Sequence, residues 1–434
     1  MSGINSDVLV IGGGTAACVA AESAIEAGKK VTMVFPNGGS SEISGGAIDI
    51  FGVLPGEKPE ICEDYQSGIE AVTKAEPDHV YGKCKNEVEA GVKALVELAE
   101  AGGYPMKGFD GKNVWVPNML GTFAVNAYVP EAMADAVVEP GKETRILVVG
   151  VKGNVTFNAK AAAMSYQKYQ EKLGGKASYF STEIQIKGWG DRRKISDGEL
   201  ADYLDTKEGK EELLTLIKTF CMNNRYAFDT ILFPPVLGYL NYQENVKALK
   251  EVCGCKIAEV QSLGNSVVGY RFTRALYRAL EAKGVQLLKG SKVCKISAED
   301  QKIKASCVAG LTDQLHPGEK IEVEAPAAVL ATGGFIGGGI KARKTEVWIE
   351  LLDQNLGTLT TDQLTRDAIA EKGQQFMKLG VEVNNDLSVK DEAYKGRLFA
   401  CGDVLAGHNF ANERSGAGIA AASAYLAGKN AAAV

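Results

Sequence analysis

The 434-residue sequence predicts an α/β protein with a Rossmann-like domain, an inserted parallel α/β subdomain and a cap. The first observation is a strand, a glycine turn, a helix and a second strand within residues 7–35. The second is a strand, a glycine loop and a small-residue helix within residues 396–434. The third is a regular alternation of strands and helices over residues 144–265, which is typical of a parallel sheet.

The first segment fits a nucleotide-binding βαβ unit. A buried strand, DVLVI, is followed by a glycine turn and helix, GGGTAACVAAESAIEAG, and by a second strand, KKVTMVF. Gly12, Gly14 and Ala17 have the G-x-G-x-x-G/A spacing, in which the backbone turns tightly and the helix start offers N–H groups to a phosphate. A plain α/β crossover is the alternative interpretation. The predicted contacts are Gly12, Gly13, Gly14, Thr15, Ala16 and Ala17.

The remainder divides into three regions. Residues 272–296 predict a helix followed by strands, and residues 320–335 predict two strands that end in a glycine turn. With the two terminal segments they predict one discontinuous domain over residues 1–50, 266–344 and 396–434. The inserted subdomain covers 144–265, where VVGVKGN resembles a second phosphate loop but is interpreted as an internal strand–helix turn. Residues 51–143 and 345–395 predict a cap or interface region.

Composition and charge exclude several classes of protein. The formal net charge of −6 argues against a nucleic-acid partner, which calls for a basic patch. The chain has no long apolar run and no leader-like start, so the sequence predicts a cytoplasmic protein that meets a membrane only through a partner. Nine cysteines, with Cys253 and Cys255 as one C-G-C pair, and three histidines are interpreted as reduced structural thiols and no metal site.

Several segments resemble the two-dinucleotide-binding-domain flavoproteins, a group that includes the fumarate reductase flavoprotein relatives. They are IGGGTAA, SSEISGGAIDI, VLATGGF and LFACGDVLAG followed by GAGIAAASAYLAG. More specifically, the chain is similar over nearly its whole length to the B subunit of anaerobic glycerol-3-phosphate dehydrogenase. The segments that carry this likeness are SSEISGGAIDIFGVLP, GTFAVNAYVP, ILVVGVKGNVTFNA, SVVGYRFTRAL and ATGGFIGGGI.

The resemblance implies a Rossmann-like flavin-binding domain with FMN as the cofactor. It also implies a complex with a second flavoprotein subunit and an iron–sulfur membrane-anchoring subunit. The reaction it implies is oxidation of glycerol 3-phosphate to dihydroxyacetone phosphate, with electrons passed to quinone and then to fumarate or nitrate.

The second strand of the βαβ unit bears on the choice of cofactor. In FAD and NAD sites, an Asp or Glu about 20 residues after the glycine loop accepts hydrogen bonds from the adenosine ribose. Phe35 occupies that place, and Glu42 comes beyond the expected end of the strand. The missing charge-assisted bonds, roughly 1.5–3 kcal/mol each, disfavour adenosine. FMN fits this arrangement, and FAD bound through backbone contacts is the alternative.

Further flavin contacts are predicted in loops with small side chains. The SSEISGG glycines would let the backbone lie against the flavin ring, although surface turn chemistry explains the same composition. Asp403 resembles the flavoprotein carboxylate that binds a ribityl hydroxyl, with a turn-forming role as the alternative. The last helix would point its first N–H groups at the pyrimidine edge of the flavin, or simply pack tightly. The full set is Ser40, Ser41, Ser44, Gly45, Gly46, Thr332, Gly333, Gly334, Gly402, Asp403, Gly416, Ala417 and Gly418.

Oxidation of a small anionic alcohol needs a base for the hydroxyl proton and a cation for the anion. His408 is the candidate base, because its loop is expected to face the flavin. Arg271 and Arg414 are the candidate anion-binding groups, although surface or salt-bridged roles are commoner for each. Two other functions stay open: a free-standing flavin-dependent enzyme of the fumarate reductase type, and a structural subunit with a degenerate nucleotide site.

Overall fold

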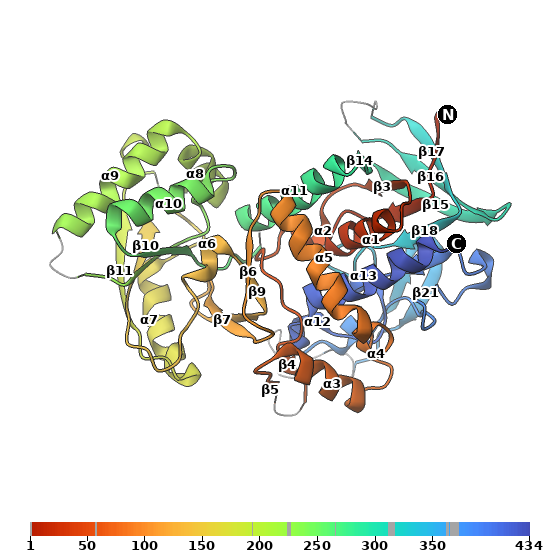
Figure 1. Cartoon of the computed structure of the whole chain (residues 1–434), viewed down its shortest axis with the longest axis horizontal. Coiled ribbons are helices and arrows are strands. Elements are labelled where there is room, and N and C mark those ends of the chain that lie inside the picture. Colours follow the sequence, from red (N-terminus) through yellow and green to blue (C-terminus); the bar gives the residue numbers. More distant parts are fainter. Residues whose placement is uncertain are drawn as a thin grey trace. The chain divides into compact units, whose positions relative to one another are not determined.

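The computed structural model of the chain (Figure 1) divides into two compact units. Unit 1 consists of Met1–Glu42, Ile48–Tyr104 and Thr273–Val434, and unit 2 of Ile43–Ala47 and Pro105–Phe272. The sequence predicted three regions, and the segment 51–143 is divided here after Tyr104. The structure describes residues 2–56, 59–192, 194–223, 227–264, 266–310, 317–361, 364 and 373–434. Parts of the segment 345–395 therefore lie outside the described residues.

The centre of unit 1 is a parallel sheet in which every strand except the edge strand β14 is fully buried. Its order is β14-β3-β2-β18-β22, so strands from both ends of the chain lie side by side. Strands buried on both faces read as near-continuous apolar runs, as the sequence VLVI does here. The strands are β2 (Val8–Ile11), β3 (Val31–Phe35), β14 (Gln286–Lys289), β18 (Ala327–Leu330) and β22 (Leu398–Ala400).

Three helices of unit 1 pack together through small residues. They are α1 (Thr15–Glu26), α5 (Val88–Ala101) and α13 (Gly416–Ala432), and Figure 1 shows them side by side. A Cβ on Gly428 of α13 would lie 2.3 Å from the carbonyl oxygen of Ala20 in α1. A Cβ on Gly91 of α5 would lie 2.4 Å from the carbonyl oxygen of Ala421. The small residues of the last helix are therefore required for close helix packing.

The other elements of unit 1 surround this core. A second sheet, β1-β17-β16-β15, joins β1 (Ser2–Asn5), β17 (Lys320–Ala325), β16 (Lys302–Val308) and β15 (Lys292–Glu299). Small sheets are formed by β4 (Val53–Leu54) with β5 (Glu60–Ile61), and by β19 (Lys341–Arg343), β20 (Glu346–Ile349) and β21 (Gln354–Thr358). The shorter helices are α2 (Gly39–Glu42), α3 (Tyr65–Ala75), α4 (Tyr81–Cys84) and α12 (Phe410–Glu413), and α11 (Val267–Ala282) has residues in both units.

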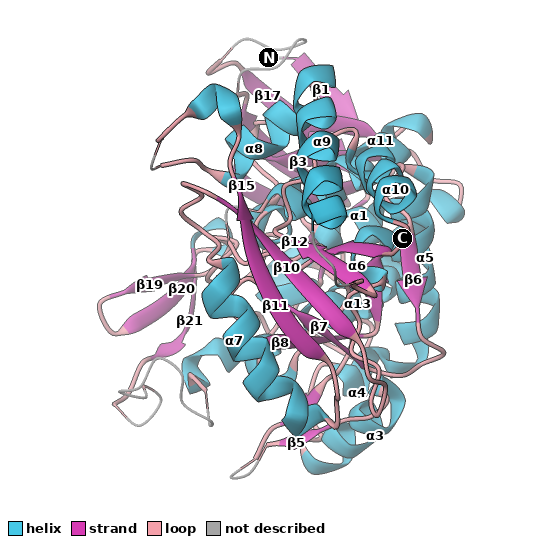
Figure 2. Cartoon of the chain, turned by 90° about the vertical axis from the view of Figure 1, so that its left-hand side faces the viewer, coloured by secondary structure: helices cyan, strands magenta, loops and turns pink. Residues whose placement is uncertain are grey.

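Unit 2 contains a parallel four-stranded sheet in the order β11-β10-β12-β13. Its strands are β10 (Arg145–Val151), β11 (Ser178–Ile184), β12 (Thr230–Phe233) and β13 (Lys256–Glu259). Helix α7 (Ala159–Gln170) lies along β10 and β11 (Figure 2). The remaining elements are α8 (Asp197–Leu204), α9 (Lys207–Asn223), α10 (Tyr242–Cys253), α6 (Glu131–Ala134), β6 (Met106–Gly108), β7 (Val114–Pro117), β8 (Phe123–Asn126) and β9 (Tyr128–Pro130).

The predicted α/β fold with parallel sheets is confirmed, because both units contain an all-parallel sheet with helices beside it. Among the helices that the structure describes, none is long and apolar enough to cross a membrane.

Candidate functional site

Three glycine-containing loops meet in unit 1 at the carboxyl ends of β2, β18 and β22. A Cβ on Gly12, which has φ of 140°, would lie 2.1 Å from the carbonyl oxygen of Ala331. A Cβ on Gly402 would lie 2.7 Å from the Cβ of Ala16, and one on Gly334 would lie 2.9 Å from the carbonyl oxygen of Asp403. Open α/β sheets bind ligands outside the carboxyl ends of their strands. The structure therefore brings the three predicted cofactor loops together at the expected edge.

Helix α1 begins beside this convergence with Gly14 as its N-cap. A Cβ on Gly14 would meet no atom closer than the Ser41 hydroxyl, at 3.2 Å. Ser41 accepts a hydrogen bond from the backbone N–H of Thr15 at 2.9 Å, and the neighbouring Ser40 lies in the same short helix, α2. The first turn of α1 holds no acidic residue. Its positive dipole end is therefore not balanced by a local carboxylate, which suits a phosphate.

A buried polar group at the same edge supports a ligand there. The Thr332 hydroxyl is buried and has no hydrogen-bond partner within the described part of the chain. Buried hydroxyls are normally hydrogen-bonded, because an unsatisfied one costs about 1–3 kcal/mol. Thr332 and its neighbours Gly333 and Gly334 follow β18 directly. These residues fit a polar, phosphate-bearing cofactor such as a flavin nucleotide.

Phe35 lies in the core and not on an open surface. Its ring centroid is 5.0 Å from that of Tyr277, and a Cβ on Gly13 would lie 2.4 Å from the Phe35 ring. The Tyr277 hydroxyl donates a hydrogen bond to the carbonyl oxygen of Gly13 at 2.6 Å. Glu42, the next carboxylate, accepts a hydrogen bond from the N–H of Gly38 at 3.0 Å. Aromatic rings thus fill the place of the usual ribose acceptor. The Glu42 carboxylate is hydrogen-bonded within its own loop, to Gly38.

The start of α13 differs from the expectation. The sequence predicted open N–H groups at Gly416, Ala417 and Gly418, but the Asp49 carboxylate accepts from Ala417 at 2.9 Å. The Asp49 carbonyl oxygen accepts from Gly418 at 2.8 Å. Burial raises the pKa of Asp49 to about 6, although hydrogen bonds from Ala417 and Gly416 and the charge of Arg414 act to lower it. The helix start is therefore already capped by a carboxyl group of the chain.

His408 is buried in the loop after β22, next to Asp403. Its Nε2 lies 3.6 Å from Asp403 Oδ1, and its Nδ1 is buried with no hydrogen-bond partner among the described residues. The structure thus joins two residues that the sequence assigned to different roles, the candidate base and the candidate ribityl ligand. A histidine positioned by a carboxylate is a common arrangement for proton transfer.

Two further buried side chains near His408, those of Glu413 and His79, were not predicted from the sequence. Glu413, with no exposed surface, accepts hydrogen bonds from His79 Nε2 at 3.3 Å, from the Ser415 hydroxyl at 2.8 Å and from the Asn409 N–H at 2.7 Å. Burial raises the pKa of Glu413, but the hydrogen bond and charge of His79, the charge of His408 and the Asn409 N–H lower it to about 2. No sequence pattern marks His79 and Glu413, which are 334 positions apart.

The two candidate arginines have different surroundings. Arg271, in unit 2, forms a buried two-bond ion pair with Glu259 at 2.5 and 3.1 Å and donates to the carbonyl oxygen of Gly238. Its guanidinium also lies 4.2 Å from the Tyr242 ring centroid. This corrects the expectation for Arg271, because its donors are committed to the interior of unit 2. Arg414 is exposed, directly before α13.

The loop with Ser44, Gly45 and Gly46 belongs to unit 2. A Cβ on Gly45 would lie 2.5 Å from the Gln261 side-chain amide, and Gln261 accepts a hydrogen bond from Asn126 at 3.1 Å. The glycine is therefore required by the chain's own packing. The sequence did not predict the Gln261–Asn126 hydrogen bond, because the two residues are 135 positions apart.

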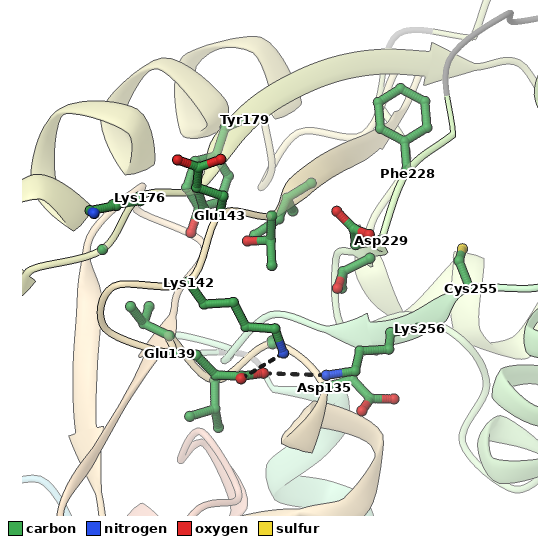
Figure 3. Close-up of a pocket in the computed structure, with 18 of the residues that line it drawn as sticks. Asp135, Glu139, Lys142, Glu143, Lys176, Tyr179, Phe228, Asp229, Cys255 and Lys256 are labelled. Carbon is green, nitrogen blue, oxygen red and sulfur yellow. Dashed lines mark hydrogen bonds and ion pairs between the residues drawn. The ribbon is translucent and has the colours of Figure 1, made fainter.

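Unit 2 also contains a cavity of about 660 Å³ at the amino ends of its parallel strands (Figure 3). Figure 3 shows Glu139 between Lys142 and Lys256, at 2.7 and 3.3 Å. A second pair on its wall joins Lys250 to Asp135 at 2.8 Å. None of the predicted site residues lines this cavity. It is thus separate from the three glycine loops of unit 1.

Comparisons with known proteins place the whole chain beside flavoprotein relatives. Residues 7–183 match the family model described as FAD binding domain. A protein of Halobacterium salinarum, named as the B subunit of a probable anaerobic glycerol-3-phosphate dehydrogenase, is 28% identical, over 99% of this chain and 98% of its own. The B subunit of the anaerobic glycerol-3-phosphate dehydrogenase of Vibrio cholerae is 25% identical, over 97% of this chain and 95% of its own. An open flavocytochrome c3 fumarate reductase is 13% identical with a TM-score of 0.46, over 99% of this chain and 78% of that one. That last likeness is too distant to argue from.

The FAD binding domain match and the named relatives support a flavin-dependent oxidoreductase. Along almost its entire length, the chain is a homologue of proteins named as the B subunit of anaerobic glycerol-3-phosphate dehydrogenase.

Proposed function

We propose that the chain is the flavin-carrying B subunit of an anaerobic, quinone-linked glycerol-3-phosphate dehydrogenase. The complex would oxidise glycerol 3-phosphate to dihydroxyacetone phosphate and pass electrons to partner subunits. Support comes from relatives of that name that align with at least 97% of the chain. The structural observation that carries the proposal is the meeting of three glycine loops at one sheet edge, one of which holds the buried Thr332 hydroxyl that has no partner among the described residues.

Different residues of unit 1 would contact different parts of the flavin. The start of α1, at Gly14, would hold the phosphate through backbone N–H groups other than that of Thr15, which donates to Ser41. Thr332 and Asp403, on neighbouring loops, would bind hydroxyl groups of the ribityl chain. A bound flavin would supply the acceptor for a hydride. His408 would hold the substrate hydroxyl proton, with Asp403 positioning its ring, and the exposed Arg414 would attract an anionic substrate.

FMN is the proposed form of the flavin. The packing of Phe35 against Gly13 and Tyr277 leaves no carboxylate at the end of β3 for an adenosine ribose. The hydrogen bond from Gly38 likewise occupies Glu42. An FMN phosphate needs only the glycine loop and the helix start.

The proposed partners are a second flavoprotein subunit and an iron–sulfur membrane-anchoring subunit. Relatives named as one subunit of a dehydrogenase support the existence of partners. We place the chain in the cytoplasm, held at the inner face of the membrane by such a partner. Within the complex, its flavin would relay electrons.

Release and identification of the cofactor tests the proposal first. The purified protein is denatured, and the released cofactor is identified by mass and fluorescence. FMN at one equivalent supports the proposal. FAD would overturn the FMN assignment, and a colourless protein that takes up neither flavin would overturn the flavin site itself.

The second candidate is a free-standing FAD-dependent dehydrogenase or reductase of the fumarate reductase type, and the FAD binding domain match supports its cofactor. Steady-state turnover by the purified chain alone, with an artificial electron acceptor, separates the two. Activity that appears only after partner subunits are added supports the first proposal.

A further inference from the structure

Three cysteines of unit 2 lie together outside the flavin loops. Cys221 is near the end of α9, Cys253 is the last residue of α10, and Cys255 directly precedes β13. The turn between the last two depends on Gly254, whose left-handed conformation (φ of 66°) ends the helix. Only Gly254 separates Cys253 from Cys255 in the chain. All three thiols are half-buried.

Cys255 differs from its neighbours in two respects. It lines the 660 Å³ cavity. Figure 3 shows its sulfur at the right of the view, to the right of Asp229 and above Lys256. The hydrogen bond from Cys253 lowers the pKa of the Cys255 thiol, against the effects of burial and of the Asp229 charge. The same hydrogen bond raises the pKa of Cys253. A partly exposed thiol that lines a cavity, one residue away from a second thiol, has the features of a redox-active site.

The described residues do not favour a metal as the occupant. No group of three or more His, Cys, Asp or Glu side chains in the described ranges could hold a metal ion. Four other cysteines, Cys18, Cys84, Cys307 and Cys401, are buried, and burial raises the pKa of each thiol. Such thiols are inert.

We propose that Cys255 and Cys253 form a thiol–disulfide exchange site, with a small-molecule disulfide as the co-reactant. The Cys255 thiolate attacks one sulfur of that disulfide; a new S–S bond forms, and the other half leaves as a thiolate. The Cys253 thiol then loses its proton and attacks the Cys255 sulfur, which releases the second half. The two cysteines are oxidised by two electrons, and the small disulfide is reduced to two thiols.

The test uses the full-length protein and oxidised glutathione at neutral pH. Samples are alkylated at intervals, digested and mapped by mass spectrometry. We expect Cys255 to be modified several-fold faster than Cys294, which is more exposed and belongs to unit 1. A disulfide that contains Cys255 should follow.

Matched variants separate the two steps. Cys253→Ser should leave glutathione attached to Cys255, because the second attack is lost, and Cys255→Ser should abolish the disulfide. Cys294→Ser is the control and should change neither. Faster modification of Cys294, or an internal disulfide that lacks Cys255, would overturn the proposal. Because Cys253→Ser retains a donor to Cys255, it reports on exchange even if Cys255→Ser folds poorly.

Discussion

At the scale of single residues, the glycine loop contains two kinds of glycine. Gly12 faces a carbonyl oxygen 2.1 Å from a would-be Cβ, so any side chain there disrupts the chain itself. Gly14 is less crowded, because the nearest atoms to a would-be Cβ are the Ser41 hydroxyl at 3.2 Å and the Gly38 carbonyl oxygen at 3.5 Å. A substitution at Gly14 therefore acts on a ligand before it acts on the fold.

We expect Gly14→Val to fold but to lose flavin, because its methyl groups would block the approach of a phosphate to the start of α1. Flavin absorbance per protein after purification measures the loss. Gly188→Val, at a position with nothing within 4 Å of a would-be Cβ, is the control. A fully loaded Gly14→Val protein would remove the glycine loop from the flavin site.

Phe35 offers a test of cofactor choice. Phe35→Glu restores the usual ribose acceptor and should raise the share of FAD taken up from an equimolar mixture with FMN. It should also reduce stability, since the new carboxylate would replace a ring that packs on Tyr277 and Gly13. Phe35→Leu, which stays apolar, should keep the FMN preference. If the FAD share of Phe35→Glu matches that of Phe35→Leu, adenosine is not selected at this strand end.

At the scale of elements, two helices are capped by aspartates whose pKa values are shifted in opposite directions. Asp49 caps the buried start of α13, and burial raises its pKa to about 6. Asp64 caps the exposed start of α3, where hydrogen bonds from Ser67 lower its pKa. A cap contributes hydrogen bonds in both cases, but only the buried one carries a charge that is costly at neutral pH.

The sign of the pH effect follows from these shifts. Folded Asp49 holds its proton more tightly than the unfolded chain, so its contribution is full below about pH 4 and is lost as the pH rises through about 6, a difference of about 2–3 kcal/mol. Asp49→Asn keeps an acceptor for Ala417, so it should flatten the stability profile over that window in denaturant unfolding. Asp64→Asn should instead remove stability that is present above the unfolded pKa. An unchanged slope in Asp49→Asn would refute the raised pKa.

Arg271 belongs to the architecture of unit 2. Removing one partner of a buried ion pair strands the other, so Arg271→Met should destabilise the protein by about 3–5 kcal/mol. Adding Glu259→Gln should recover much of that loss. Thermal unfolding of the single and double variants measures both, and no recovery would contradict the pairing. Substrate affinity of any folded variant should stay unchanged.

At the scale of the whole molecule, the sequence predicted the strands, helices and glycine turns, because these depend on local sequence pattern. The βαβ unit of residues 7–35, the last strand and helix, and the parallel subdomain all carry periodic apolar runs and glycine turns, and these are present in the structure. The Asp49 cap, the His79–Glu413 pair and the Gln261–Asn126 pair join residues 135 or more positions apart, with no periodicity to reveal them. Long-range polar contacts are therefore what sequence reasoning missed.

The interleaved central sheet also sets the order of events during synthesis. β3 ends at Phe35, but β18, which pairs with β2, begins at Ala327. At about 5–20 residues per second, a ribosome needs about 15–60 s to supply that strand. The first βαβ unit must wait for this time with its β2 edge unpaired, and its β3 edge also stays unpaired until β14 is made. The loop after β22 arrives later still. The proposed flavin site is therefore complete only once the nascent chain is nearly finished, so any flavin it holds would be taken up after most of the chain has been made.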